Sequence, residues 1–160
     1  MTAAIDKDDL IRYVGSVHAR THEALVLLSD TALAWRPAAT EFSAGELVMH
    51  IFNTRLMNLD AIQQQRQRYR GHEVSAGTTA HDLQKLSLRS GKKVIAGLVD
   101  ADFAIPVPNT ATGSAPAWQR VVAGFIEHEV HHRSQLCSYL TAMGLDAPPL
   151  YGLHAENLPR

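Results

Sequence analysis

The segment most informative about the fold is Glu127-His128-Glu129-Val130-His131-His132-Arg133-Ser134-Gln135-Leu136, which lies within a long run of helical apolar periodicity. Three histidines and two carboxylates occupy its first six residues. On a helix, His128 and His132 are about 40° apart around the axis, and their Cβ atoms are about 5–6 Å apart. Two such imidazoles can bind one metal ion at about 2.0–2.1 Å, with a third ligand from elsewhere in the chain.

The residues His128-Glu129-Val130-His131-His132 also match the H-E-x-x-H pattern of zinc proteases, in which the glutamate is the general base. The extended form of that pattern needs glycine at position 135 and histidine at position 138, where this chain has Gln135 and Ser138. Another protease form needs a downstream carboxylate such as Glu156, which lies in a proline-flanked tail with no predicted helix. We therefore favour a metal site in a helical bundle, with Glu129 as a neighbour of undecided role.

The candidate third ligand is His50, an isolated histidine within a second predicted helix. The residues alone leave its role open, because a lone histidine on an apolar helix is more often a hydrogen-bonded core residue than a ligand. Several polar neighbours could hydrogen-bond an imidazole or a substrate, and spacing does not choose among them. These neighbours are Glu46, Asn53, Glu129 and Gln135.

The other histidines give weaker candidates. His131 could replace one of the pair, but we expect it to be exposed or to support a ligand through a hydrogen bond. His18 and His22 form another pair spaced by four residues, which we rank below the main segment because no cysteine lies near it. We expect the histidines outside the main segment to be solvated or capping residues: His18, His22, His72, His81 and His154.

Apolar residues at helical spacing predict four helices, over residues of about 7–29, 43–71, 80–100 and 114–143. The expected fold is therefore an all-α four-helix bundle. Ser43, followed by Glu46, predicts a capping box at the second helix, and Thr78 or Thr79 is the expected N-cap of the third. We expect Ser114 to cap the last helix and the proline-containing stretch 101–115 to form an extended strip or short hairpin before it.

The second predicted helix finishes in the basic run Arg66-Gln67-Arg68-Tyr69-Arg70-Gly71. Cations in a last turn and a glycine after it are favoured by the helix dipole and by C-cap geometry, which is the interpretation we prefer. The alternative is that this run binds a phosphate or a carboxylate.

A length of 160 residues suits one domain, 1–160. Fifteen basic and sixteen acidic residues give a net charge of −1, which argues against nucleic acid or an anionic membrane as a partner. The polar N-terminus lacks the apolar core of a signal peptide, and no apolar run approaches the ~18 residues of a membrane span. The single cysteine, Cys137, cannot form an internal disulfide, so we expect a cytoplasmic protein in which this thiol is inert packing.

Two blocks of sequence resemble the DinB/YfiT-like superfamily of small helical metal-binding proteins. The first is Trp35-Arg36-Pro37 followed by Ser43-Ala44-Gly45-Glu46-Leu47-Val48-Met49-His50-Ile51, and the second is the segment from His128 to Leu136. The order of predicted elements agrees as well, so the resemblance covers nearly the whole chain. Ser134 departs from the second block, since glycine is frequent at that position.

The resemblance implies a four-helix bundle whose metal ligands are His50, His128 and His132. It also implies zinc or nickel as the bound ion, a homodimer, and a small-molecule substrate. Some members of the superfamily are transferases that use a low-molecular-weight thiol, and others are thiol-dependent isomerases.

Three hypotheses about function follow. The first is a metal-dependent enzyme, a transferase acting with a low-molecular-weight thiol, because a divalent ion favours the thiolate form of a bound thiol. The second is a non-catalytic, stress-related metal-binding or interaction domain. The third is a metal-dependent hydrolase, including the protease discussed above. No catalytic residue is assigned by the sequence.

Overall fold

The structure is a computed structural model, and it describes residues 6–150. Four long helical rods and one short hairpin make up the fold, as the sequence predicted. The elements in chain order are α1 (Lys7–Leu25), the 3₁₀ helix η1 (Asp30–Ala34), α2 (Ala44–Gln64), α3 (Ala80–Val99), β1 (Pro106–Asn109), β2 (Gly113–Pro116), α4 (Ala117–Val121), the π-helix η2 (Val122–Glu127) and α5 (His128–Ala142). The elements α4, η2 and α5 follow one another without a break and form the last rod.

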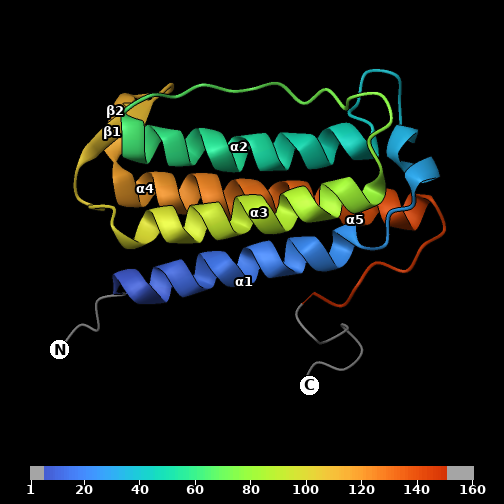
Figure 1. The fold of residues 1–160 in the computed structure, drawn as a ribbon, viewed down its shortest axis with the longest axis horizontal. Helices are drawn as coiled ribbons and strands as arrows, with labels where there is room; N and C mark the ends of the chain where they lie inside the picture. The colour runs from blue at the N-terminus through green and yellow to red at the C-terminus, as the bar shows by residue number, and fades with distance from the viewer. Residues whose placement is uncertain (1–5, 151–160) are drawn as a thin grey trace.

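The rods lie side by side, with α1 and the last rod running in one direction and α2 and α3 in the other (Figure 1). Because α2 and α3 are parallel, the chain between them must return the length of the bundle. The segment 65–79 does this by running back along α2 (Figure 1). Residues of this return segment therefore lie beside α2 along its length.

Side-chain caps fix where α2 and α3 begin. The Ser43 hydroxyl accepts from the Glu46 amide at 3.2 Å, and the Glu46 carboxylate accepts from the Ser43 amide at 2.7 Å. Thr79 and Asp82 make the equivalent reciprocal pair at the start of α3. Both capping predictions are confirmed, and the first of them sets the rotation of His50 within α2.

The end predicted for the second helix is wrong. The α2 helix ends at Gln64, and Gln65 is the C-cap with a left-handed φ of 55°. The arginines of the basic run therefore lie in the return segment and not in the last helical turn. Arg70 pairs with Asp60 of α2 at 2.9 Å, so this cation ties the return segment to the helix. The first helix is also shorter than predicted, since α1 ends at Leu25 and η1 follows.

The start predicted for the last helix is wrong too. Ser114 lies in β2, where it pairs with Pro108, and α4 begins only at Ala117 after Pro116. The hairpin forms because Gly113, with φ of 76°, turns the chain back on Asn109. Prolines stand at the outer ends of this two-stranded ladder, where a missing amide is tolerated.

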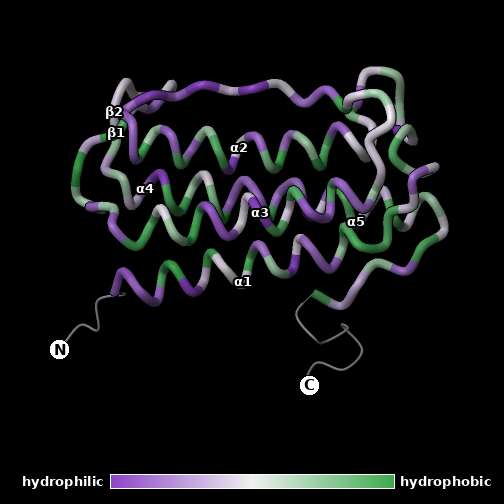
Figure 2. Tube along the Cα trace, in the orientation of Figure 1, coloured by the Kyte–Doolittle hydropathy of each residue, from purple (hydrophilic) through white to green (hydrophobic). Residues whose placement is uncertain are grey.

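The buried core consists of two apolar clusters, one at each end of the bundle. Hydrophobic and hydrophilic residues alternate along α1, α2 and α3 (Figure 2), as expected of helices that bury one face. Gly97 of α3 is a point of close approach, because a Cβ there would lie 2.7 Å from Leu59 Cδ1 of α2. Among residues 6–150, no helix is long and apolar enough to cross a membrane.

Candidate metal centre

Three imidazoles from two helices converge near the middle of the bundle. His50 Nε2 of α2 lies 3.1 Å from His128 Nε2 and 3.1 Å from His132 Nε2, both of α5. Within the described part of the chain, these histidines form the one group of at least three His, Cys, Asp or Glu side chains whose ligand atoms all lie within 4.8 Å of each other. The group could therefore hold a metal ion, and it contains the three histidines singled out in the sequence.

The spacing of these nitrogens fits a single divalent ion. Two nitrogens bound to one tetrahedral ion at ~2.0–2.1 Å lie about 3.3 Å apart, close to the 3.1 Å found for both pairs that include His50. Three nitrogens packed this closely also need a common cation or proton, because their lone pairs otherwise repel. The donor set suits a metal and leaves the fourth tetrahedral position to a non-protein ligand.

A chain of hydrogen bonds fixes which nitrogen of His132 carries its proton. Tyr139 donates its hydroxyl to the Phe42 carbonyl at 3.2 Å, so its oxygen accepts from Gln135 Nε2 at 3.1 Å. Gln135 then presents Oε1 to His132 Nδ1 at 3.0 Å, and His132 must donate from that nitrogen. The proton is thus on Nδ1, and Nε2 keeps its lone pair for a metal.

Tyr69 of the return segment performs the same task for His50. Its hydroxyl lies 2.8 Å from His50 Nδ1 and 3.3 Å from His72 Nδ1. If His50 donates from Nδ1 to this oxygen, Tyr69 can donate onward to His72, and His50 Nε2 stays free of a proton. Tyr69 was not among the predicted site residues, because its contact with His50 depends on the path of residues 65–79. His72, expected to be solvated or capping, is half-buried and supports Tyr69.

All three imidazoles favour their neutral, metal-binding form. Burial, reinforced by the nearby His132 and His72 rings, lowers the pKa of His50 to about 4. Burial and the neighbouring His132 and His50 rings likewise lower the pKa of His128 to about 4. The pKa of His132 is lowered chiefly by burial. At neutral pH these rings are therefore in the neutral form that a metal binds, and no imidazolium has to lose a proton first.

Glu129 is not part of the centre. It is buried in the bundle, where its carboxylate accepts from Arg55 Nε at 2.7 Å and from a second Arg55 nitrogen. Burial alone would raise the pKa of Glu129, but the Arg55 guanidinium outweighs this effect and holds the pKa below its usual value. The undecided role is thereby assigned: Glu129 is the counter-ion of Arg55, with the Ser90 hydroxyl as a further acceptor for this guanidinium.

The expectation that His18 is solvated or capping is wrong. This residue is only 6% exposed and lies with Nε2 3.3 Å from a Glu129 oxygen. Burial and the Arg55 charge lower its pKa to about 4, against the opposing effect of Glu129. His18 and His22 therefore do not form a competing metal group within residues 6–150.

The remaining candidates fall outside the centre. Glu46 is used in the cap of α2 and pairs with Arg36 at 3.2 Å, and Asn53 donates to the Gly71 carbonyl. His131 is exposed, as predicted. The Cys137 thiol is half-buried, and burial raises its pKa, which agrees with an inert role. Glu156 and His154 lie outside the described residues.

A π-helix directly precedes the ligand-bearing helix. In η2 the backbone makes wider turns than in an α-helix, and such segments are frequent at functional sites. Gly124 within it approaches Asn58 of α2 so closely that a Cβ would lie 2.4 Å from the Asn58 side chain. Beside these residues a cavity of about 260 Å³ opens next to His50 and His128.

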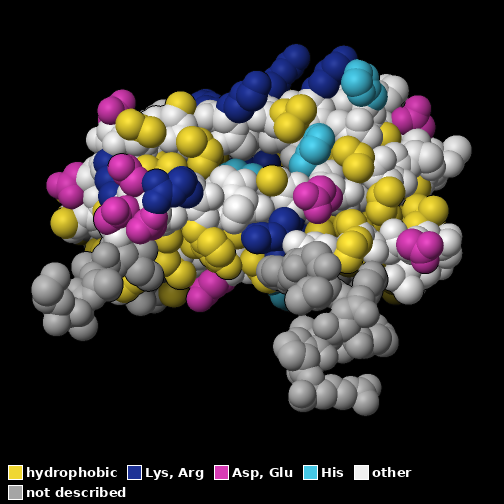
Figure 3. Space-filling model, turned by 90° about the horizontal axis from the view of Figure 1, so that it is seen from below, with side chains coloured by type: hydrophobic (Ala, Val, Ile, Leu, Met, Phe, Trp, Pro, Cys, Tyr) yellow, Lys and Arg dark blue, Asp and Glu magenta, His cyan; other side chains and the backbone are white. Residues whose placement is uncertain are grey.

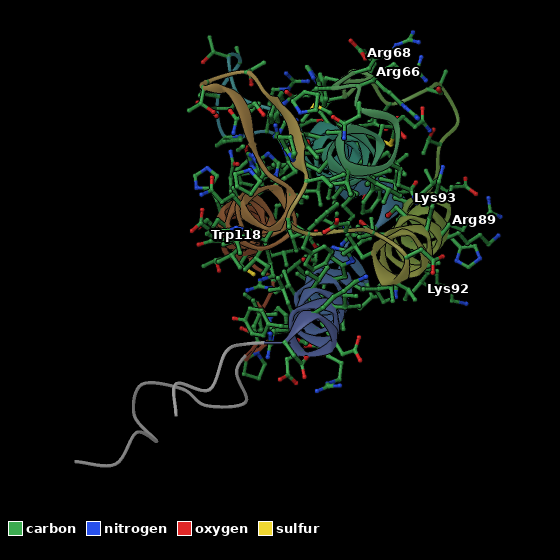
Figure 4. The ribbon with its side chains drawn as sticks, turned by 90° about the vertical axis from the view of Figure 1, so that its left-hand side faces the viewer. Arg66, Arg68, Arg89, Lys92, Lys93 and Trp118 are labelled. Carbon is green, nitrogen blue, oxygen red and sulfur yellow. The ribbon has the colours of Figure 1, made fainter. Side chains whose placement is uncertain are left out.

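The surface away from the centre shows mixed character. Seen from below, hydrophobic side chains are interspersed with charged ones (Figure 3). On the side facing the viewer in Figure 4, cations of the return segment and of α3 point outward from the body, with Trp118 on α4 apart from them. These labelled cations are Arg66, Arg68, Arg89, Lys92 and Lys93. Anion binding by the basic run stays a prediction, and the Asp60 carboxylate among these cations weakens it.

The fold and the histidine group together define a helical-bundle protein with a three-histidine centre that could hold a metal ion. The chain belongs to the DinB family, whose family model matches residues 1–159. Among solved structures, it is similar to a DinB-like protein from Bacillus subtilis, with 23% identity over 87% of this chain and 95% of that one and a TM-score of 0.71. It is also similar to a DinB-like protein from Bacillus cereus, with 16% identity over 92% of this chain and 97% of that one and a TM-score of 0.73. No curated protein matches the chain. These likenesses establish the DinB-like fold.

Proposed function

We propose that this protein binds a divalent metal ion, zinc or nickel, through His50, His128 and His132, and that it is a metal-dependent transferase acting with a low-molecular-weight thiol. The observation that carries the proposal is the convergence of the three Nε2 atoms, together with the hydrogen bond that holds the His132 proton on the outer nitrogen. A structural site is usually closed by four protein ligands. Three protein ligands beside a cavity suit chemistry on a bound small molecule better.

A divalent ion held by three neutral imidazoles supplies Lewis acidity, which lowers the pKa of a thiol that it binds. The protein's own residues position and shield this centre. Tyr69 and Gln135 hold two of the imidazoles in orientation from behind. His50 and His128 form one wall of the cavity, so a small molecule there would lie against the ligand atoms. Cys137 is not available as a competing thiolate, because burial raises its pKa.

The first test is metal content. We expect purified wild-type protein to bind one divalent ion per chain, and the His50→Ala variant to lose it while staying folded. The matched control is His81→Ala, which removes an exposed histidine of α3 and should leave the metal content unchanged. Metal retained at full stoichiometry in His50→Ala would exclude the three-histidine centre.

The second test separates an enzyme from a non-catalytic binding domain. The metal-loaded protein is incubated with a panel of cellular thiols and electrophiles, and conjugate formation is followed by mass spectrometry. We expect conjugation that depends on the metal and is absent in His50→Ala. Turnover with none of the panel, at full metal occupancy, would instead favour the non-catalytic, stress-related domain.

Assembly as a homodimer in the cytoplasm is part of the proposal. Large apolar side chains remain exposed on several elements, and a second copy could cover some of them: Tyr13, Leu88, Val99 and Trp118 are each about half exposed. The lone Cys137, which has no disulfide partner, agrees with a reducing compartment. Light scattering coupled to size-exclusion chromatography tests the dimer, and a monomer mass at micromolar concentration would contradict it.

A further inference from the structure

The cavity next to the histidine centre has a cation in its wall. Arg120 of α4 lines this cavity together with Asn58 of α2 and Gly124 of the π-helix. Its volume of about 260 Å³ lies just below the ~300–1,000 Å³ typical of ligand pockets, which limits the occupant to a small molecule. The same cavity reaches His50 and His128, so one small molecule could touch both the cation and the centre.

Among residues 6–150, only neutral oxygens hold Arg120 in place. It donates to Asn58 Oδ1 at 3.2 Å, to Gln67 Oε1 at 3.4 Å and to the Pro108 carbonyl of the hairpin. Its Nε is buried and has no hydrogen-bond partner within the described part of the chain. Arg120 is thus oriented by the surrounding oxygens, but the described residues leave one N–H and the positive charge uncompensated.

In other arginines of this protein, a carboxylate compensates the charge of the guanidinium. Arg55 is paired with Glu129 inside the bundle, and Arg70 is paired with Asp60 at the surface. A half-buried guanidinium without a carboxylate has lost part of its hydration and gained no counter-ion, which is unfavourable. Burial also lowers the pKa of Arg120. Thr54 lines the same cavity, and its buried Oγ1 is a second atom for which residues 6–150 provide no hydrogen-bond partner.

We propose that Arg120 binds the carboxylate of a small substrate whose other end, a thiol, reaches the histidine centre. The Arg120 guanidinium in the cavity wall offers its positive charge to the carboxylate, and Thr54 lies in the same wall. The substrate class is therefore a small thiol that carries a carboxylate. The inference rests on the proposed function for the thiol end only, because the carboxylate end depends on Arg120 alone.

The carboxylate end is tested without any metal or turnover. The Arg120 Nε–H resonance is assigned by its loss in the Arg120→Gln variant, and the wild-type protein is titrated with propionate and, separately, with neutral propionamide. We expect a saturable shift with propionate and none with propionamide. No shift of this resonance with propionate, in either the metal-free or the metal-loaded protein, overturns the inference, whatever the thiols do.

The thiol end is tested on the cobalt-loaded protein, where a thiolate bound to the ion gives a charge-transfer band. The probes are 3-mercaptopropionate, 2-mercaptoethanol and cysteamine, which differ in the charge at the far end. We expect 3-mercaptopropionate to bind about ten- to a hundredfold more tightly than 2-mercaptoethanol, the size expected of a charged hydrogen bond. Cysteamine should bind more weakly than either. Equal affinities for all three would overturn the inference.

Two variants test whether Arg120 causes the tighter binding of 3-mercaptopropionate. Arg120→Gln should abolish the advantage of 3-mercaptopropionate and leave the affinity for 2-mercaptoethanol unchanged. Because Arg120 also contacts the hairpin, the second variant keeps it in place: Asn58→Asp supplies a carboxylate that neutralises the guanidinium and should abolish the same advantage. A preference retained in both variants overturns the inference. A propionate shift without any charge-transfer band would leave the carboxylate site standing and remove the thiol part of the proposed function.

Discussion

Gln135 Oε1 accepts a hydrogen bond from His132 Nδ1 at 3.0 Å, one turn further along the same helix. The bond is the last step of a chain that begins at the Phe42 carbonyl and passes through Tyr139. A backbone carbonyl can only accept, so the direction of every bond in the chain is set. The tautomer of a candidate metal ligand is thus determined by the carbonyl of Phe42, whose ring packs against another candidate ligand, His50, with 5.2 Å between ring centroids.

Replacing Gln135 should therefore weaken metal binding without removing a ligand. We expect Gln135→Leu to lower the metal affinity by about 10- to 100-fold, because His132 loses the acceptor that holds its proton on Nδ1. Gln135→Glu keeps an acceptor and should retain most of the affinity. Competition with a chromophoric chelator measures both, and equal affinities for the wild type and Gln135→Leu would disprove the orienting role.

Removing the Glu129 carboxylate should cost stability and leave the metal content unchanged. Glu129→Leu leaves the Arg55 charge buried without its partner, and we expect a loss of about 3–5 kcal/mol in the free energy of unfolding. The double variant Arg55→Met/Glu129→Leu should be much less destabilised, since no unpaired charge remains. Urea unfolding measures the stabilities. Loss of metal from a folded Glu129 variant would show instead that this carboxylate serves the centre.

The stability of the metal-free protein should fall as the pH drops from about 6.5 to about 4. His18 has its pKa lowered from 6.5 to about 4 in the folded state, so in this window the unfolded chain binds a proton that the folded chain does not. The free energy of unfolding should decrease by up to about 3 kcal/mol from this residue. His18→Gln should make the pH dependence less steep, and the share of His50, His128 and His132 should remain, whereas His81→Gln should leave the slope unchanged. An unchanged slope in His18→Gln would contradict the assignment.

Gly124 should tolerate no side chain. An added Cβ would meet three atoms of the Asn58 amide at 2.4–2.6 Å, so Asn58 must give up its bonds to Arg120 and to the Thr54 carbonyl. We expect Gly124→Ala to destabilise the protein by about 1–3 kcal/mol.

Thermal unfolding measures the effect of Gly124→Ala, and two further variants serve as a control and a rescue. Gly15 in α1 is the matched control, because its Cβ would meet Ile95 at an ordinary 3.7 Å, and Gly15→Ala should be neutral or stabilising. The double variant Asn58→Ala/Gly124→Ala should recover part of the loss, since the clash is with the Asn58 side chain. A destabilised Gly15→Ala together with a neutral Gly124→Ala would refute the packing argument.

Local signals in the sequence predicted the features that depend on near neighbours. The capping box of Ser43 and Glu46, the N-cap at Thr78 or Thr79 and the four-residue spacing of His128 and His132 each involve residues close together in the sequence. The periodicity of the sequence left open whether His50 lies near His128 and His132. The family resemblance supplied that expectation.

The errors have a common physical origin in long-range packing. Arg55 and Glu129 are 74 residues apart, and nothing in the local pattern says that their charges are buried together. Tyr69 reaches His50 only because residues 65–79 run back along α2 as an irregular segment, where the sequence suggested a continuing helix. A wide helical turn such as η2 has no periodicity of its own in six residues.

That wide turn has a consequence for comparing this chain with others. A π turn contains one residue more than an α turn. An uninterrupted α-helix would therefore need one residue fewer between Trp118 and His128 to point these two side chains in the same directions. A relative that lacks this residue could keep both faces in register by winding the segment as ordinary α-helix. A single-residue gap between these positions in a sequence alignment therefore leaves the direction of the histidines unchanged. An alignment that forbids this gap would misplace the histidines by about a quarter of a turn.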